Sequence, residues 1–289
     1  MRFSFSEAMC DPAQYVPLAK ACEAAGIDTF NVPDSIFYPE HADDIYPYTP
    51  DGKRNFLEDK PFIEPFTLVP ALAAVTERLL FATFVYKLPI RQPVLVAKAL
   101  ASVAVMSNER FKFGVGLSPW PQDFEGCGQD WKTRGKRMDE MIEIIRGLLT
   151  GDYYSFESEH YRIPSIKINP VPTEPVKFLI GGHADAALRR AARIGDGWMM
   201  AGFDAEVLHR QLDTLNGYLD EYGRDRSAFE IHVIPLGAKG PDDFKRLADK
   251  GVTDILVGAR NSYEDDAMTL EQKLAWIERF GDNVLAKIR

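Results

Sequence analysis

A join between a helix and a short apolar strand recurs along the chain and constrains its fold more than any other sequence feature. In each copy an amphipathic stretch ends at a turn residue, and a β-rich run begins directly after it. The copies span residues 22–34, 105–116, 192–202 and 248–258. The turn residues are Gly26, Asn108, Gly195 and Gly251. We expect them in the left-handed conformation that often ends a helix. Short apolar runs are typical of buried parallel strands, so the joins predict an α/β fold.

Apolar stripes at helical spacing separate the predicted strands. Their members are Leu208, Leu212, Leu215, Leu219 and Tyr222; Met138, Met141, Ile142, Ile145 and Leu149; and Leu270, Leu274 and Ile277. Asp204 is the expected N-cap of the first stripe, and Pro93 lies in the first turn of a helix running to about Met106. The predicted strands are 2–7, 29–33, 79–85, 111–116, 177–181, 197–201, 230–236 and 254–258. Eight alternating units favour a (β/α)₈ TIM barrel. The alternative, an open Rossmann-type sheet, lacks the expected GxGxxG after its first strand.

Composition narrows the functional class. The 289 residues, 46% hydrophobic and 27% charged, are compatible with a single barrel domain over 1–289. A net charge of −9 without a long basic run argues against a nucleic-acid partner. The three cysteines, Cys10, Cys22 and Cys127, show no zinc-ligand spacing, so we expect no metal site and a reducing cytoplasm. The N-terminus lacks the apolar stretch of a signal peptide, and no apolar run approaches the roughly 20 residues of a membrane helix.

Two irregular segments interrupt the alternation. Residues 35–63 and 150–176 are rich in aromatic residues, charged residues and proline. We expect the first after the second strand, the other in the fourth βα unit, and both over the C-terminal face of the barrel, where long insertions act as lids or binding loops. The alternative is a role in oligomer contacts. Phe37, Tyr38, Tyr46 and Tyr48 in the first segment suggest a partly apolar substrate.

The chain resembles the bacterial luciferase-like oxidoreductases. The resemblance is carried by LPIRQPVLVAKALASVAVMSNERFKFGVGLSPW, TRGKRMDEMIEIIRGLL, PVPTEPVKFLIGG and AALRRAARIGDGW, in that order, and covers most of residues 1–202. It implies a (β/α)₈ barrel with an insertion after the fourth unit. It also implies either FMN or coenzyme F420, a deazaflavin, as the cofactor. Members with F420 move a hydride to or from an organic substrate, whereas FMN members are mostly monooxygenases supplied with reduced flavin.

The resemblance also implies where the cofactor lies. The F420 branch usually has Asp-His where this chain has Asp34-Ser35, and a glycine where Ser118 stands. A non-prolyl cis peptide is expected at Phe84-Val85, behind the ring of the cofactor. The backbone of Gly181-Gly182-His183, at the start of a helix, would bind the cofactor phosphate. The predicted cofactor-binding residues are Ser6, Asp34, Ser35, Thr83, Phe84, Val85, Gly116, Leu117, Ser118, Gly181, Gly182 and His183.

Catalysis would need one proton donor or acceptor beside the cofactor. The candidates are Asp34, Glu7 and His41, of which His41 can equally be a solvated loop residue. Trp120 either walls the substrate cavity or packs in the core. The sequence therefore predicts an F420-dependent oxidoreductase that takes a small organic substrate and forms a homodimer. An FMN-dependent monooxygenase and a non-catalytic flavin-binding barrel remain the alternatives.

Overall fold

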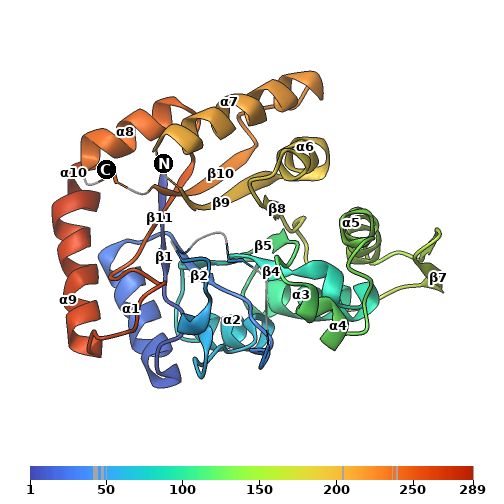
Figure 1. Ribbon diagram of the computed structural model, residues 1–289, viewed down its shortest axis with the longest axis horizontal. Coiled ribbons are helices and arrows are strands. Elements are labelled where there is room, and N and C mark those ends of the chain that lie inside the picture. Colours follow the sequence, from blue (N-terminus) through green and yellow to red (C-terminus); the bar gives the residue numbers. More distant parts are fainter. Residues whose placement is uncertain are drawn as a thin grey trace.

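Eight parallel strands close into a barrel that is surrounded by helices (Figure 1). The computed structural model describes residues 1–41, 45–46, 49, 51–203, 205–235, 237–238 and 240–288. The barrel strands are β1 (Arg2–Ser6), β2 (Thr29–Val32), β3 (Leu80–Thr83), β5 (Phe111–Gly116), β8 (Phe178–Gly181), β9 (Gly197–Phe203), β10 (Glu230–Pro235) and β11 (Asp254–Val257). Each pairs in parallel with its neighbours, and pairing between β3 and β5 closes the ring. The fold is therefore a (β/α)₈ TIM barrel, built from the eight strands that the sequence predicts.

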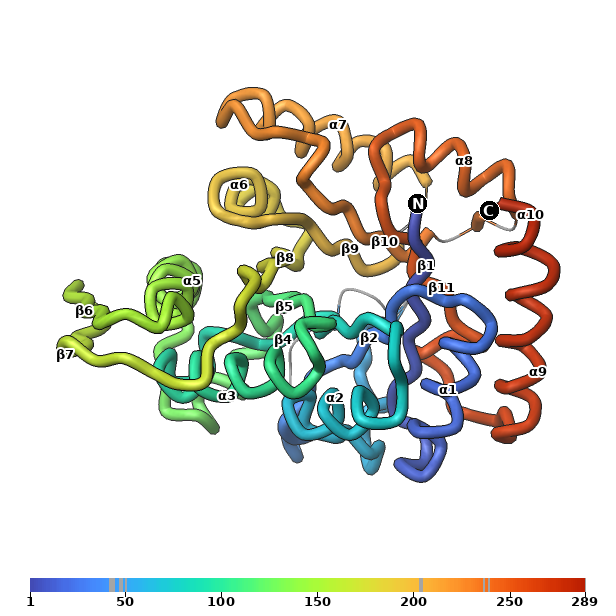
Figure 2. The backbone as a smooth tube through the Cα atoms, turned by 180° about the vertical axis from the view of Figure 1, so that it is seen from behind, coloured from blue at the N-terminus to red at the C-terminus, as the bar shows by residue number. Residues whose placement is uncertain are grey.

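A helix follows each barrel strand and covers it from outside, as Figures 1 and 2 show from opposite sides. These helices are α1 (Tyr15–Ala25), α2 (Pro65–Ala73), α3 (Pro93–Met106), α5 (Arg134–Leu149), α6 (Asp185–Ile194), α7 (Ala205–Glu221), α8 (Pro241–Asp249) and α9 (Leu270–Phe280). Shorter elements are α4 (Pro121–Gly126), α10 (Ala286–Ile288), η1 (Pro12–Gln14), η2 (Asn55–Leu57), η3 (Leu88–Ile90), η4 (Gly281–Leu285) and the two-residue strand β4 (Tyr86–Lys87). Within the described residues, no helix has the length and apolar character needed to span a membrane.

The helix ends agree with the sequence at most of the predicted positions. Gly26, Asn108 and Gly251 have φ angles of 82°, 53° and 92°, so they are left-handed as expected. Gly195 is the exception, since its φ is −83°. A Cβ atom at Gly195 would lie 2.8 Å from the carbonyl oxygen of Ala191, so crowding rather than a left-handed turn explains this glycine. Pro93 is in the first turn of α3 as predicted, whereas the expected N-cap Asp204 lies outside the described residues.

Aromatic side chains fill the layer between the strands and the helices. They alternate along the strands with side chains that point into the barrel, because successive residues of a strand face opposite sides. Phe113 and Phe178, on adjacent strands, meet edge to face with their ring centroids 5.5 Å apart. Six phenylalanine side chains on the barrel strands are fully buried: Phe3, Phe5, Phe30, Phe81, Phe113 and Phe178. Burial of these rings fixes which residues of each strand face inward.

The first insertion, residues 35–63, follows β2 and lies at the C-terminal face, as predicted. Tyr46 packs 5.8 Å from Trp120, which follows β5. The Nζ atom of Lys60 lies 2.8 Å from a carboxylate oxygen of Asp265, which follows β11. Loops from three strands therefore meet over the barrel mouth. Tyr48, which the sequence analysis places in the same cluster, lies outside the described residues.

The second insertion, residues 150–176, does not cover the mouth, so that prediction is wrong. It forms an antiparallel hairpin of β6 (Tyr154–Glu157) and β7 (Arg162–Ile166), which lies beyond α5 at one side of the molecule (Figures 1 and 2). The Ser158 hydroxyl donates a hydrogen bond of 2.8 Å to Glu140 on α5. The segment follows a helix rather than a strand, so the chain enters it from the opposite end of the barrel.

Candidate active site

The predicted cofactor residues converge at the C-terminal mouth. In a parallel barrel all strands end at the same face, which is where barrel enzymes carry their active sites. Several of these residues are only half-buried there, so they border the mouth rather than the core. They are Ser6, Ser35, Phe84, Val85, Leu117, Gly181, Gly182 and His183. Thr83, Gly116 and Ser118 are buried just behind them, and His41 is exposed in the first insertion.

Val85 occupies the centre of this arrangement. The Phe84–Val85 peptide bond is cis, as the resemblance implies. A Cβ atom at Gly116 or at Gly181 would lie 2.7 Å from a Val85 methyl group, so both glycines are required by the position of this side chain. Behind them the Thr83 hydroxyl donates a 2.7 Å hydrogen bond to the carbonyl oxygen of Gly114. Val85 therefore forms a half-buried apolar platform between β5 and β8.

Asp34, which is buried, forms an ion pair with the half-buried Arg91. One carboxylate oxygen accepts 2.8 Å hydrogen bonds from Arg91 Nη1 and from the backbone N–H of Lys87, and the other accepts from Arg91 Nη2 at 2.8 Å. Burial acts to lower the pKa of Arg91, but the charge of Asp34, its hydrogen bond and the nearby Tyr86 and Glu64 together raise the pKa. Asp34 thus fixes Arg91 and the backbone after the Val85 platform.

Lys87 and Asp123 make a second ion pair at the mouth. Lys87 Nζ lies 2.7 Å from an oxygen of Asp123, and the Ser118 hydroxyl donates to the same oxygen. Both side chains of the pair are at most 7% exposed. Burial lowers the pKa of Lys87, and the charge of Asp123 only partly opposes this effect. The proton of Lys87 is consequently easier to remove than that of a lysine exposed to solvent.

Glu7 lies at the end of β1 and is engaged by two cations. Its Oε1 atom accepts hydrogen bonds from Arg260 at 3.1 and 2.9 Å, and Lys273 Nζ lies 3.5 Å from Oε2. Lys273 is fully buried and also binds Asp266. These contacts join β1 to α9 and to the loop before it. Glu7 therefore ties barrel elements together, in the way that Asp34 does on the other side of the mouth.

The N-terminus of α6 offers backbone donors at the mouth. Ala184 is its N-cap, and no side chain in the described part of the chain caps the helix there. Gly182, with a φ of 130°, precedes it and is strained for any residue with a side chain. Burial lowers the pKa of His183, so its imidazole is neutral at pH 7. Free N–H groups at a positive helix end suit a phosphate group.

Aromatic rings form a wall beside these groups. Trp120 is 6% exposed and lies under two cations, with Arg54 Cζ 4.4 Å and Lys87 Nζ 4.3 Å from its ring centroid. Tyr46, Phe56 and Tyr263 continue the cluster, with ring centroids 5.6 to 6.0 Å apart. Trp120 thus packs in the closed part of the mouth and also borders its polar groups.

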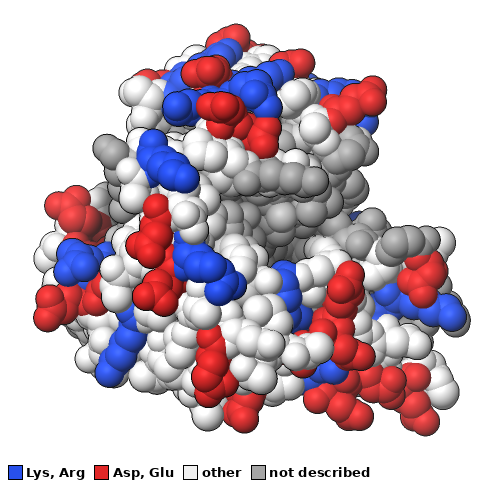
Figure 3. Space-filling view, turned by 90° about the vertical axis from the view of Figure 1, so that its left-hand side faces the viewer, with Lys and Arg blue, Asp and Glu red and all other residues white. Residues whose placement is uncertain are grey.

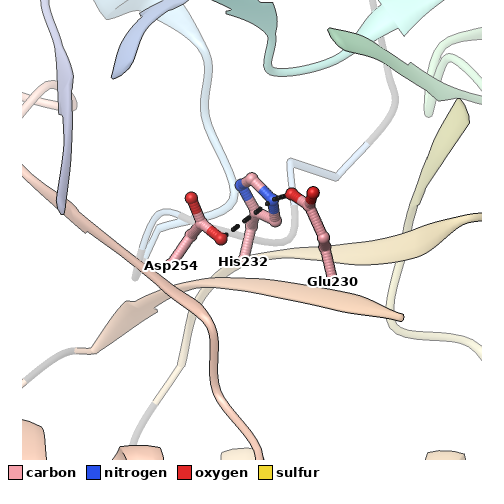
Figure 4. Close-up of side chains that lie close together, drawn as sticks. All are labelled: Glu230, His232 and Asp254. Carbon is pink, nitrogen blue, oxygen red and sulfur yellow. Dashed lines mark hydrogen bonds and ion pairs between the residues drawn. The ribbon is translucent and has the colours of Figure 1, made fainter. Parts of the chain in front are cut away.

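A separate polar cluster lies inside the barrel at its N-terminal end. His232 stands between two carboxylates, with Nε2 2.9 Å from Glu230 and 3.3 Å from Asp254 (Figure 4). These three residues have the donor types of a metal site. Arg2 and Lys112, however, lie 2.8 and 2.6 Å from the same Glu230 oxygen. Cations of the chain itself therefore neutralise this cluster and would repel a metal ion.

The electrostatics of the surface do not favour a polyanion on the face that Figure 3 shows. Lysine and arginine side chains alternate there with aspartate and glutamate side chains around a hollow. A nucleic-acid surface would instead gather basic side chains.

Sequence reasoning missed the basic partners of the mouth carboxylates. Lys87 and Arg91 follow Val85 within six residues, whereas Arg260 is far from Glu7 in the sequence. One signal could have identified Lys87 and Arg91. They are two basic residues that follow the end of a predicted strand closely, in a chain with a net negative charge. No local pattern indicates Arg260 or Lys273.

Comparison with known proteins agrees with the fold. A family model described as luciferase-like monooxygenase matches residues 4–270. The uncharacterized protein Rv0940c of Mycobacterium tuberculosis is 53% identical over 290 residues, covering all of both chains. An F420-dependent glucose-6-phosphate dehydrogenase of Gordonia bronchialis is 25% identical, over 95% of this chain and 72% of that protein.

Solved structures show the same fold at lower sequence identity. The monooxygenase RslO1 from Streptomyces bottropensis superimposes with a TM-score of 0.78 at 17% identity, covering all of both chains. The coenzyme F420-dependent tetrahydromethanopterin reductase from Methanopyrus kandleri has a TM-score of 0.77 at 13% identity, over all of this chain and 99% of that one. With the family match over residues 4–270, these findings show that the chain belongs to the luciferase-like monooxygenase family.

Proposed function

We propose that this protein is an F420-dependent oxidoreductase that transfers a hydride between the deazaflavin and a small organic substrate. The observation that carries the proposal is the pairing of two features at one mouth. These are the half-buried Val85 platform between Gly116 and Gly181 and the uncapped N-terminus of α6 beside it. The F420-dependent relative with 25% identity supports this choice of cofactor.

The residues present fit such a group. The apolar Val85 side chain suits the face of a planar ring, and the backbone N–H groups of Asp185 and Ala186 suit a phosphate. The deazaflavin would supply the hydride chemistry when bound. We assign cofactor contacts to the half-buried residues at the strand ends. They are Ser6, Ser35, Phe84, Val85, Leu117, Gly181, Gly182 and His183.

The protein's own contribution is positioning and one proton. Asp34 and Glu7 are better suited to positioning than to proton transfer, because the carboxylate of each already accepts hydrogen bonds from an arginine. Lys87 Nζ, 2.7 Å from Asp123, is a further candidate to hold and release a proton, because burial lowers its pKa. The aromatic wall around Trp120 would exclude water from the reacting atoms.

Titration of the purified protein with F420 and with FMN tests the proposal. Fluorescence of the cofactor reports binding. We expect micromolar binding of F420 and much weaker binding of FMN. Ala184→Asp places an anion at the α6 N-cap, and an aspartate there stabilises the helix. This variant should keep its stability but bind F420 at least about tenfold more weakly. Ala184→Asn, which caps without charge, is the control. Binding of FMN without binding of F420 would overturn the choice of cofactor.

An FMN-dependent monooxygenase is the second candidate, and Ser35 favours it, because the F420 branch usually has histidine at that position. A protein that binds either cofactor without turnover in either direction would support a non-catalytic barrel instead. Light scattering of the purified chain tests the further proposal of a homodimer.

A further inference from the structure

Arg54 is a buried cation whose hydrogen-bonding groups are mostly unused. It precedes η2 in the first insertion and is 4% exposed. Its Nη2 atom donates one long hydrogen bond of 3.3 Å to the amide oxygen of Gln122. The Nε and Nη1 atoms have no partner among the described residues. Buried polar groups are nearly always hydrogen-bonded, and a buried charge usually has a counter-ion, so this guanidinium indicates a missing anion.

The neighbouring cations do not share this property. Lys87 has Asp123 at 2.7 Å, and Arg91 has Asp34 at 2.8 Å. In the described part of the mouth, no carboxylate forms an ion pair with Arg54. Among the described residues of this part of the mouth, three cations (Lys87, Arg91 and Arg54) therefore face two carboxylates (Asp34 and Asp123), and one positive charge is left over. That surplus matches a ligand group with a single negative charge.

Trp120 supplies a third unused donor next to Arg54. Its indole Nε1 is buried and has no partner within the described residues. The guanidinium carbon of Arg54 lies 4.4 Å from the centroid of this indole, so the unused donors belong to two side chains in direct contact. The ring of Tyr46 packs on Trp120, and the rings of Phe56 and Tyr263 pack on Tyr46. Unused donors and a cluster of aromatic rings are therefore neighbours in this part of the mouth.

We propose that Arg54 and Trp120 form a subsite for the carboxylate of a ring-bearing organic acid. Both side chains donate only, which suits an acceptor-only carboxylate, and the aromatic wall suits the ring. A phosphate group brings up to two negative charges against one surplus positive charge and fits less well. The assignment of this acid as the substrate rests on the proposed function. Binding of the acid to the cofactor-free protein is independent of the proposed function.

Calorimetric titration of the full-length, cofactor-free protein tests the subsite. The probes are benzoate, the neutral analogue benzyl alcohol and inorganic phosphate. We expect benzoate to bind more tightly than either of the others and to raise the melting temperature. Arg54→Met should weaken benzoate binding about 10- to 100-fold, because it removes a charged hydrogen-bond donor. Lys53→Met removes the same charge from the adjacent exposed residue and should leave the affinity unchanged.

Two further variants keep the test decisive if Arg54→Met does not fold. Trp120→Phe removes the N–H group but keeps a ring, and Arg54→Lys keeps the charge but loses the Nε donor. Each should weaken benzoate binding several-fold. Equal benzoate affinity in the wild type and these variants would overturn the proposal, as would equal binding of benzyl alcohol or tighter binding of phosphate. No cofactor is present, so failure to bind F420 would overturn only the proposed function.

Discussion

At the scale of single residues, the mouth is defined by how its charges are paired. Asp34 and Glu7 are acidic residues at strand ends, and from the sequence each could equally be an acid, a base or an anchor. The structure gives Asp34 a bidentate partner in Arg91 and gives Glu7 the paired cations Arg260 and Lys273. These contacts favour the role of an anchor for both residues, because each carboxylate holds cations from distant parts of the chain in place.

Substitution of Asp34 separates these roles. Asp34→Asn leaves the half-buried Arg91 without its counter-ion, so the free energy of unfolding should fall by about 1–3 kcal/mol. Urea denaturation measures this change. Asp152→Asn, at an exposed loop position, should change it by less than about 0.5 kcal/mol. Unchanged stability of Asp34→Asn, together with lost turnover, would instead assign Asp34 to proton transfer.

At the scale of elements, the mouth depends on Val85 fitting between two strands. Val85 follows β3, while Gly116 and Gly181 end β5 and β8, and the distance from an added Cβ to a Val85 methyl group is the same 2.7 Å at both glycines. The second insertion shows the opposite case. The hairpin of β6 and β7 packs on the outside of α5, so it contributes no residue to this contact.

A double-mutant cycle tests the contact between β8 and Val85. Gly181→Ala should lower the free energy of unfolding by about 1–3 kcal/mol, because the new methyl group meets the Val85 side chain. Val85→Ala removes the atoms in conflict, so the double variant should be more stable than the sum of the two single changes predicts. Urea denaturation of the four proteins gives the coupling energy. Additive effects would show that the two positions do not touch.

At the scale of the whole molecule, the two ends of the barrel differ in how charge is balanced. The N-terminal end has Glu230 and Asp254 inside the barrel, with Arg2, Lys112 and His232 around them. Burial acts to raise the pKa of Glu230, but the hydrogen bond from His232 and the charge of Lys112 together lower it well below its usual range. This network joins β1 to β10 and β11 and so stabilises the closure of the barrel.

Stability should therefore depend on pH on the acid side. The pKa of Glu230 is lower in the folded state, so its contribution is fully present above the unfolded-state pKa of about 4.3 and is lost as the pH falls below it. The urea midpoint of the wild type should decrease from pH 5 to pH 3. Glu230→Gln should be less stable at pH 7 and show a shallower decrease. Glu125→Gln, at an exposed position, should follow the wild type. Parallel curves for wild type and Glu230→Gln would contradict this account.

The sequence by itself determined the barrel and the ends of its strands. Period and turn chemistry are local properties, so the helix-to-strand joins and apolar stripes were enough to locate all eight strands. The cofactor candidates came instead from the resemblance to the luciferase-like oxidoreductases. The predicted location of residues 150–176 was wrong, because composition does not distinguish a loop that follows a strand from a loop that follows a helix.

Only the tertiary structure decided which charges meet. Asp34 and Arg91 are 57 residues apart, Glu7 and Arg260 are 253 apart, and Arg54 reaches Gln122 across 68. Ring closure brings such residues together, and no local pattern records which ones face each other. The same closure leaves Arg54 without a carboxylate among the described residues, because burial and pairing depend on every neighbour at once.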